Sequence, residues 1–148
     1  SRGLGDVYKR QELDEGSNWE GLMTIRHYNL TNCITIVDRN HCMIDGNTED
    51  VMKLEPLADK FVAFGFHTIV CEGNNIVSLC KAIDEAHKTK DKPTVIVADT
   101  IKGVGIKLTS GNYKWHYGAI DEEMAKVAAK DLDEYSAERI ARCGKEFE

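Results

Sequence analysis

Polar residues that could bind a phosphate group or a metal ion follow each of three apolar runs in the sequence. Residues 38–40 (Asp-Arg-Asn) follow the first run, residues 72–75 the second, and the glycine-rich stretch 99–105 the third. Carboxylate and amide oxygens are the ligands that hard divalent cations prefer. An acidic turn at residues 12–15 precedes all three stretches. The types and order of these residues indicate a diphosphate and metal site.

A parallel sheet would bring these three stretches together. Apolar, β-branched runs predict buried strands at residues 32–38, 67–71 and 93–99. Helical patterns predict helices at residues 18–28, 50–65, 75–88 and 121–143, the last allowing a break near Asp133. This alternation predicts an α/β fold, a parallel β-sheet with helices on both faces. The three polar stretches then lie on one edge, beyond the carboxyl ends of the strands.

Composition excludes several classes of protein. A chain of 148 residues with 42% hydrophobic content is long enough for one globular domain. The net charge of −6 argues against nucleic acid as a ligand, because phosphate backbones are bound by clustered Lys and Arg. The five cysteines are odd in number and form no C-x-x-C pair, which is typical of reduced thiols in a cytoplasmic protein. We expect neither a membrane partner nor an export signal, since no apolar run approaches the roughly 20 residues that a membrane helix needs.

Five stretches of the sequence resemble transketolase. They read ELDEGSNWE, IVDRN, IDGNTEDVMKLEPLADKF, DKPTVIVADTIKGVG and KWHYGA, and they extend from Glu12 to about Met124. The resemblance is closest to the N-terminal subunit of the split bacterial form, which carries the diphosphate half of a thiamine diphosphate site. It implies that the chain has part of the thiamine diphosphate-binding fold.

The resemblance also implies an activity and partners. Transketolases of the pentose phosphate pathway transfer a two-carbon ketol unit between sugar phosphates, with thiamine diphosphate as cofactor. The partner would be a C-terminal transketolase subunit or further domains, in a homodimer or heterotetramer of the complete enzyme. Because this chain lacks other family motifs and domains, we expect it to be inactive alone.

A metal site is implied by one family signature, a Gly-Asp-Gly turn followed about thirty residues later by an Asn. In the family, the Asp and Asn side chains and the backbone carbonyl two residues beyond the Asn hold magnesium, or calcium or manganese, on the cofactor diphosphate. By this register Asn40 is a metal ligand through its side chain, and Cys42 through its backbone carbonyl alone. Ile44 matches a position that packs near the cofactor. Taken without the resemblance, Asn40 would be read as a turn residue and Ile44 as a core residue.

Two further residues correspond to catalytic positions of the family. His116, in KWHYGA, matches a histidine that reaches the diphosphate and the sugar substrate, and an imidazole is suited to hydrogen bonding with both. Glu15 matches a glutamate of an acidic network near the dimer interface. The structural alternatives are a surface histidine in a polar loop and a solvated charge at a helix N-terminus.

The sequence departs from the family at the second metal ligand. Residues 9–11 read Lys-Arg-Gln where the family has Gly-Asp-Gly, so Arg10 stands in place of the carboxylate. Residues 1–11 match nothing in the family, and we interpret them as a non-native artefact segment that precedes a partial transketolase diphosphate-binding domain at 12–148. The rival interpretation is that Gly5-Asp6 is a displaced native Gly-Asp pair.

Two alternative functions remain open at this point. If Arg10 is native, the chain could be a noncatalytic scaffold or partner subunit that has lost its metal carboxylate. The other alternative is a related thiamine diphosphate enzyme, such as deoxyxylulose phosphate synthase or the dehydrogenase component of a 2-oxo acid complex. Such relatives would not be expected to carry ELDEGSNWE together with TEDVMKLEPLADKF.

Overall fold

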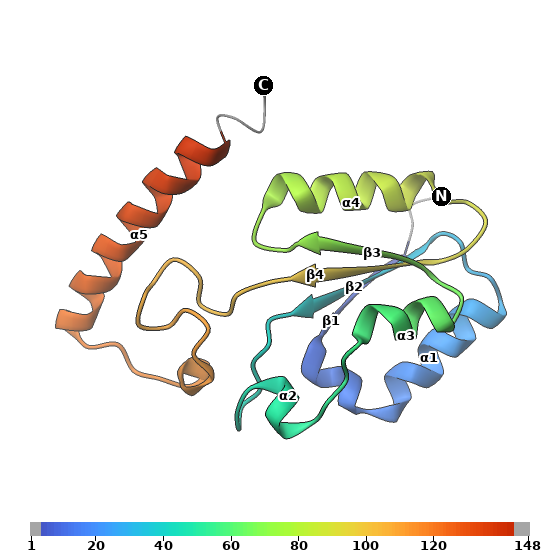
Figure 1. Ribbon diagram of the computed structural model, residues 1–148, viewed down its shortest axis with the longest axis horizontal. Coiled ribbons are helices and arrows are strands. Elements are labelled where there is room, and N and C mark those ends of the chain that lie inside the picture. The colour runs from blue at the N-terminus through green and yellow to red at the C-terminus, as the bar shows by residue number, and fades with distance from the viewer. Residues whose placement is uncertain (1–3, 144–148) are drawn as a thin grey trace.

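Four parallel strands form one sheet in the computed structural model, which describes residues 4–143 and the side chains of residues 11–142. The strands are β1 (Leu4–Lys9), β2 (Cys33–Arg39), β3 (His67–Glu72) and β4 (Thr94–Asp99), in the order β1-β2-β4-β3. Ile34 of β2 and His67 of β3 both lie beside Thr94, so β4 runs between two strands that precede it in the chain. The arrangement is visible in Figure 1.

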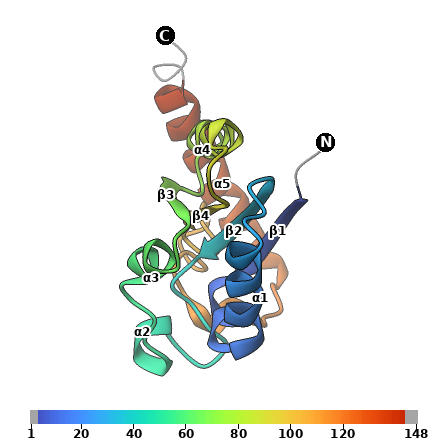
Figure 2. The same ribbon diagram turned by 90° about the vertical axis from the view of Figure 1, so that its right-hand side faces the viewer.

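Helices cover both faces of this sheet, which confirms the predicted α/β class (Figures 1 and 2). Helices α1 (Gly16–His27) and α3 (Leu57–Ala63) pack on one face, where Leu22 and Phe61 contact Val37, Val95 and Val97. Side chains of a strand alternate between faces, so the intervening residues of the strands point to the opposite side.

Helix α4 (Ile76–Lys88) packs on that opposite face through Ala82 and Ala86, which contact the fully buried Ile96. Asn75 caps this helix, since its Oδ1 accepts hydrogen bonds from the backbone N–H groups of Val77 (3.0 Å) and Ser78 (3.3 Å). The structure thereby confirms the helix predicted at residues 75–88.

The helix predicted from Asp50 to Gly65 is wrong in its first half. A short helix α2 (Thr48–Val51) is followed by extended chain, and α3 begins only at Leu57. Pro56 is the N-cap of α3, with ψ 112°, and so lies outside the helix. A residue that precedes proline is disfavoured in helical geometry, which explains the interruption. Gly65, with φ +89°, ends α3 as predicted.

Strand β1 is an element that sequence reasoning did not predict, because residues 1–11 had been set aside as non-native. The backbone of Leu4–Lys9 pairs in parallel with β2, in the register Leu4 to Cys33, and residues Arg10–Asp14 continue as the 3-10 helix η1. This segment therefore takes part in the sheet. The interpretation of residues 1–11 as a non-native artefact stays a prediction.

A long connection leads from β4 to the last helix. It contains the 3-10 helix η2 (Tyr113–His116) and ends at α5 (Glu122–Cys143), which is continuous through Asp133. The backbone N–H of Lys107 donates to Asp131 of α5 (2.9 Å), and the Lys107 ammonium pairs with Asp131 (3.2 Å) and Glu134 (2.7 Å). Within residues 4–143, no helix is long and apolar enough to cross a membrane.

Candidate diphosphate site

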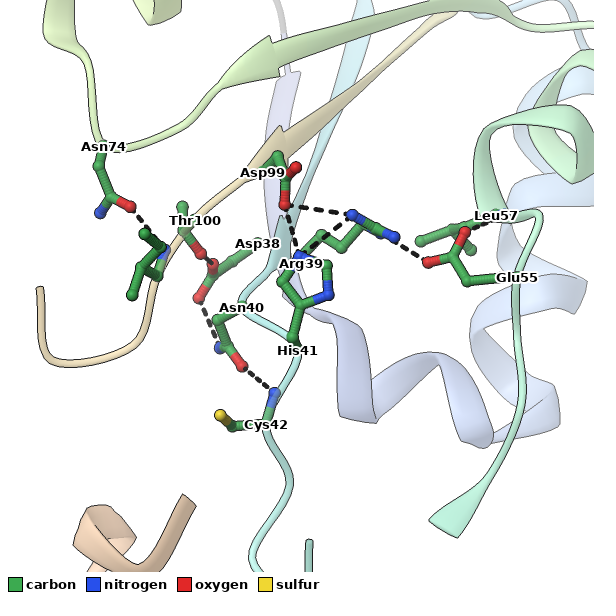
Figure 3. A network of polar contacts seen from close by, with 11 residues as sticks. Asp38, Arg39, Asn40, His41, Cys42, Glu55, Leu57, Asn74, Asp99 and Thr100 are labelled. Carbon is green, nitrogen blue, oxygen red and sulfur yellow. Dashed lines mark hydrogen bonds and ion pairs between the residues drawn. The ribbon is translucent and has the colours of Figure 1, made fainter. Parts of the chain in front are cut away.

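The turn that follows β2 holds Asn40 in a fixed orientation (Figure 3). Its Nδ2 donates to Asp38 Oδ2 (3.1 Å), and its Oδ1 accepts from the backbone N–H of Cys42 (3.0 Å). Both ends of the Asn40 amide are therefore engaged, one as donor and one as acceptor. Asn40 and Cys42 therefore lie together at the carboxyl edge of the sheet, and among the residues with described side chains only the Cys42 N–H donates to the Asn40 oxygen.

Contacts to the neighbouring strand fix the same turn. The hydroxyl of Thr100 donates to Asp38, and the backbone N–H of Thr100 donates to the carbonyl of Arg39 (3.2 Å). Thr100 follows β4 directly, so these bonds join the ends of β2 and β4. Two of the three polar stretches predicted to converge thus make direct contact.

A charged network flanks Asn40 on both sides in the sequence. Arg39 donates through Nε to Glu55 (2.6 Å) and through Nη1 to Asp99 (3.2 Å), and His41 Nε2 lies 2.6 Å from the same Asp99 oxygen. His41 has φ +61°, a left-handed conformation that is uncommon outside glycine. The network positions the two residues around Asn40, and its partly exposed ion pairs contribute only about 0–1 kcal/mol each.

His116 reaches the same neighbourhood through Lys102. The Lys102 ammonium lies 2.9 Å from His116 Nδ1, and an ammonium can only donate, so Nδ1 is the acceptor of this contact. The thiol of Cys42 lies 3.7 Å from the carbonyl of Gly111, which brings this loop against the Asn40 turn. Burial raises the pKa of the Cys42 thiol, and the charge of Lys102 opposes that shift.

Lys102 is a residue that the sequence reasoning missed. It lies inside the TIKGVG stretch, whose glycines drew attention although its lysine did not. A cation that contacts a histidine and influences Cys42 is well placed to meet an anionic group. The lysine within this glycine-rich loop was the available signal.

The other two predicted residues, Ile44 and Glu15, are both exposed. Ile44 is 41% exposed, so in this chain it is not a core residue. Glu15 is exposed directly before α1, and its side chain makes no capping hydrogen bond to that helix.

The residues present do not complete a metal site. The predicted ligands, Asn40 and the Cys42 carbonyl, offer two oxygens from one turn, while Arg10 stands at the position predicted for the carboxylate and its side chain lies outside the described part of the structure. Among the described residues, no group of three or more His, Cys, Asp or Glu side chains could hold a metal ion. A guanidinium beside a divalent cation would replace attraction by repulsion.

Parallel strands with helices on both faces, together with polar loops gathered at the strand carboxyl ends, define a cofactor-binding α/β domain. Comparison with known protein families makes this more specific. The chain belongs to the transketolase family, because its residues 7–137 match the model described as "Transketolase, thiamine diphosphate binding domain". The match includes the end of the segment interpreted as non-native.

Curated relatives of this chain include components of split transketolases. It is 37% identical over 121 residues to one subunit of the apulose-4-phosphate transketolase of Actinobacillus succinogenes, a match that covers 82% of this chain and 44% of that relative. It is 36% identical over 126 residues to the 6-deoxy-6-sulfo-D-fructose transketolase subunit SqwG of a Clostridium species, with 85% and 46% covered. The chain thus spans about half the length of the curated relatives it matches.

Solved transketolases share the fold. The transketolase of Campylobacter jejuni superposes with a TM-score of 0.81 at 26% identity, covering 90% of this chain and 21% of that one. The transketolase of Leishmania mexicana gives a TM-score of 0.64 at 30% identity, covering 93% and 24%. These likenesses favour transketolase over the other thiamine diphosphate enzymes considered from the sequence.

Proposed function

We propose that this chain is the diphosphate-binding part of a transketolase that transfers a two-carbon ketol unit between sugar phosphates. The observation that carries the proposal is the position of Asn40 and Cys42, side by side at the carboxyl end of β2 in a chain that matches the family model throughout this region. The bond-making chemistry of such an enzyme belongs to thiamine diphosphate, while the protein binds and orients.

Each predicted site residue has a proposed role in the complete protein. The Asn40 amide oxygen and the Cys42 carbonyl would contribute to a magnesium, calcium or manganese site once a carboxylate is supplied. His116 would donate to phosphate or sugar oxygens, which its acceptor contact at Nδ1 supports, since a neutral ring then carries its proton on Nε2. Ile44, exposed here, would pack against the cofactor, and Glu15 would face a second subunit.

The partner proposed is a C-terminal transketolase subunit, or further domains, in a dimeric or heterotetrameric enzyme. Support comes from the names of the split relatives, which describe them as subunits, and from the partial coverage of every relative described above. This partial coverage also supports the expectation that the 148-residue chain is inactive alone. We place the enzyme in the cytoplasm, in line with the free thiols of Cys33, Cys42, Cys71 and Cys80.

The test restores the family turn by Lys9→Gly, Arg10→Asp and Gln11→Gly. The restored chain, combined with a C-terminal transketolase subunit, should bind thiamine diphosphate in a magnesium-dependent manner by isothermal titration calorimetry. Asn40→Ala in this background should weaken binding at least about tenfold, the order expected when one charge-assisted ligand is lost.

Asn47→Ala is the matched control, because Asn47 is an exposed asparagine of the same loop whose side chain donates to Asp50 (3.0 Å), and the substitution leaves its backbone contacts in place. It should leave thiamine diphosphate affinity unchanged. Equal losses in the Asn40 and Asn47 variants would contradict the assignment of Asn40. Ketol transfer by the purified 148-residue chain alone would contradict the expected inactivity.

A noncatalytic scaffold is the second candidate, and it depends on the arginine at position 10. If the restored turn still fails to bind the cofactor with the partner present, while both proteins associate, the scaffold is the better description. Sequencing the native gene upstream of Glu12 tests the same point directly. Codons for Gly-Asp-Gly there would make residues 1–11 an artefact.

A further inference from the structure

A cavity of about 600 Å³ opens at the carboxyl edge of the sheet, beside the last turns of α5. Its lining includes Glu72, Asn74, Thr100, Ile101, Tyr135 and Arg139. The volume lies within the range of about 300–1,000 Å³ that is usual for sites of small organic ligands. The residues proposed to hold the diphosphate, Asn40, Cys42 and His116, are not among the described residues that line it.

The topology of the sheet places this cavity where ligands are expected on physical grounds. The chain leaves β2 toward α3 on one face of the sheet and leaves β3 toward α4 on the other (Figure 1). Because β4 lies between these strands, the two departing connections separate around its carboxyl end and leave a crevice. Asp99, Thr100 and Asn74 lie on this rim (Figure 3), so the cavity lies at the switch point of the fold.

The acidic groups at the cavity already have cationic partners. Glu72 pairs with Arg142 (2.7 Å), and the hydrogen bond from Arg142 is the main reason that the pKa of Glu72 lies below its usual value. Asp99 pairs with Arg39 (3.2 Å) and contacts His41 (2.6 Å). These carboxylates are therefore poorly placed to attract a further cation.

Arg139 is the cation of this cavity that forms no ion pair with a carboxylate among the described residues. Its Nη1 donates to the carbonyl of Asn74 (2.6 Å) and to the hydroxyl of Tyr135 (3.3 Å). The guanidinium carbon lies 5.8 Å from the centre of the Tyr135 ring, which holds the group in place. A guanidinium has five N–H donors in a planar fork, so Nε and Nη2 keep donors that match a phosphate or a carboxylate.

We propose that this cavity binds a small organic anion, with its phosphate or carboxylate group on Arg139. An apolar part of the ligand would contact Val70, Ile101 and Val104, which also line the cavity. Val70 is 61% exposed and Ile101 52% exposed, so covering them removes apolar surface from water. The cavity shares His41, Asp99 and Thr100 with the surroundings of the proposed diphosphate site, but its proposed anion ligand is Arg139 rather than Asn40, Cys42 or His116.

Phenyl phosphate, benzoate and inorganic phosphate test the proposal by NMR titration of the ¹⁵N-labelled 148-residue chain. Phenyl phosphate should bind more tightly than inorganic phosphate, because only the former reaches the apolar wall. Whichever of phenyl phosphate and benzoate binds with higher affinity identifies the preferred head group, phosphate or carboxylate. Shifts should centre on the backbone amides of Gly73, Ile101 and Arg139.

Arg139→Met should weaken binding at least about tenfold. Lys126→Met is the matched control, because it removes the same charge from an exposed site of the same helix, where Lys126 pairs with Glu122 (2.8 Å), and it should bind as the unaltered chain does. Arg139→Lys keeps the charge without the fork and should give an intermediate affinity, which covers the case in which the Met variant does not fold.

Three results would overturn the proposal. One is the absence of binding of all three anions at about 10 mM, a concentration that detects millimolar affinity. Another is equal binding by the Arg139→Lys variant and the unaltered chain. The third is a set of shifts centred on Lys102 and His116, which would assign the anion to the proposed diphosphate site.

Discussion

Replacing Asn75 by alanine should remove the cap of α4 and destabilise the whole domain. Asn75 is 5% exposed, and its side-chain oxygen satisfies the N–H groups of Val77 (3.0 Å) and Ser78 (3.3 Å). Loss of an N-cap costs about 0.5–2 kcal/mol. The burial of the site places Asn75→Ala in the upper half of this range, about 1–2 kcal/mol, because water cannot easily replace the lost acceptor.

Urea unfolding followed by circular dichroism measures this loss as a lower midpoint at unchanged slope. Asn47→Ala is the matched control: Asn47 also precedes a helix, but its side chain makes no capping hydrogen bond to α2, and it is exposed. This control should change the free energy of unfolding by less than about 0.5 kcal/mol. An Asn75→Ala chain as stable as the unaltered chain, or equal losses in both variants, would refute the capping argument.

Two further predictions concern the core and the last helix. Phe61→Ala should lower the free energy of unfolding by about 3–5 kcal/mol, because Phe61 is fully buried and stacks on Trp19 (centroids 5.7 Å apart); a loss below about 1 kcal/mol in urea unfolding would contradict this packing. The hydrogen bond from the Lys107 backbone lowers the pKa of Asp131, and the Lys107 side chain lowers that of Glu134. Because the pKa of each carboxyl group is lower in the folded state than in the unfolded state, ionisation stabilises the contact at pH values above the unfolded-state pKa of about 4. This stabilisation is lost as the pH falls through the folded-state pKa. The amide NMR signal of Lys107 should therefore titrate in acid and stop doing so in Asp131→Asn; an amide unchanged between about pH 7 and 2 would contradict this.

Much of the fold could be predicted from the sequence, because the buried strands and the amphipathic helices have distinct patterns. The apolar run at Thr94–Asp99 became the central strand β4, and Asn75 did mark the start of α4. The split between α2 and α3 was missed since the apolar spacing continues through Pro56, whose backbone preference overrides it. Strand β1 was missed because residues 1–11 had been set aside as non-native, although the backbone of Leu4–Lys9 pairs with β2.

Only those parts of the candidate site that follow from the topology of the sheet or from the family resemblance could be predicted. The positions of Asn40 and Cys42 follow from the end of a parallel strand, and the structure places both there. The contact of Lys102 with His116 joins two points of an irregular loop, where neither helical nor strand periodicity applies. The roles of Asn40, Cys42, Ile44, Glu15 and His116 stay predictions.

The position of β4 between β2 and β3 also sets the order in which this sheet can assemble during translation. β2 ends at Arg39, yet the strand that covers its second edge begins only at Thr94. At a synthesis rate of about 5–20 residues per second, roughly three to eleven seconds pass between the synthesis of Arg39 and that of Thr94, and during this time the second edge of β2 is unpaired. Nascent chains that stop before residue 94 therefore present open backbone edges on both β2 and β3, which makes them candidates for chaperone capture and for strand-mediated aggregation.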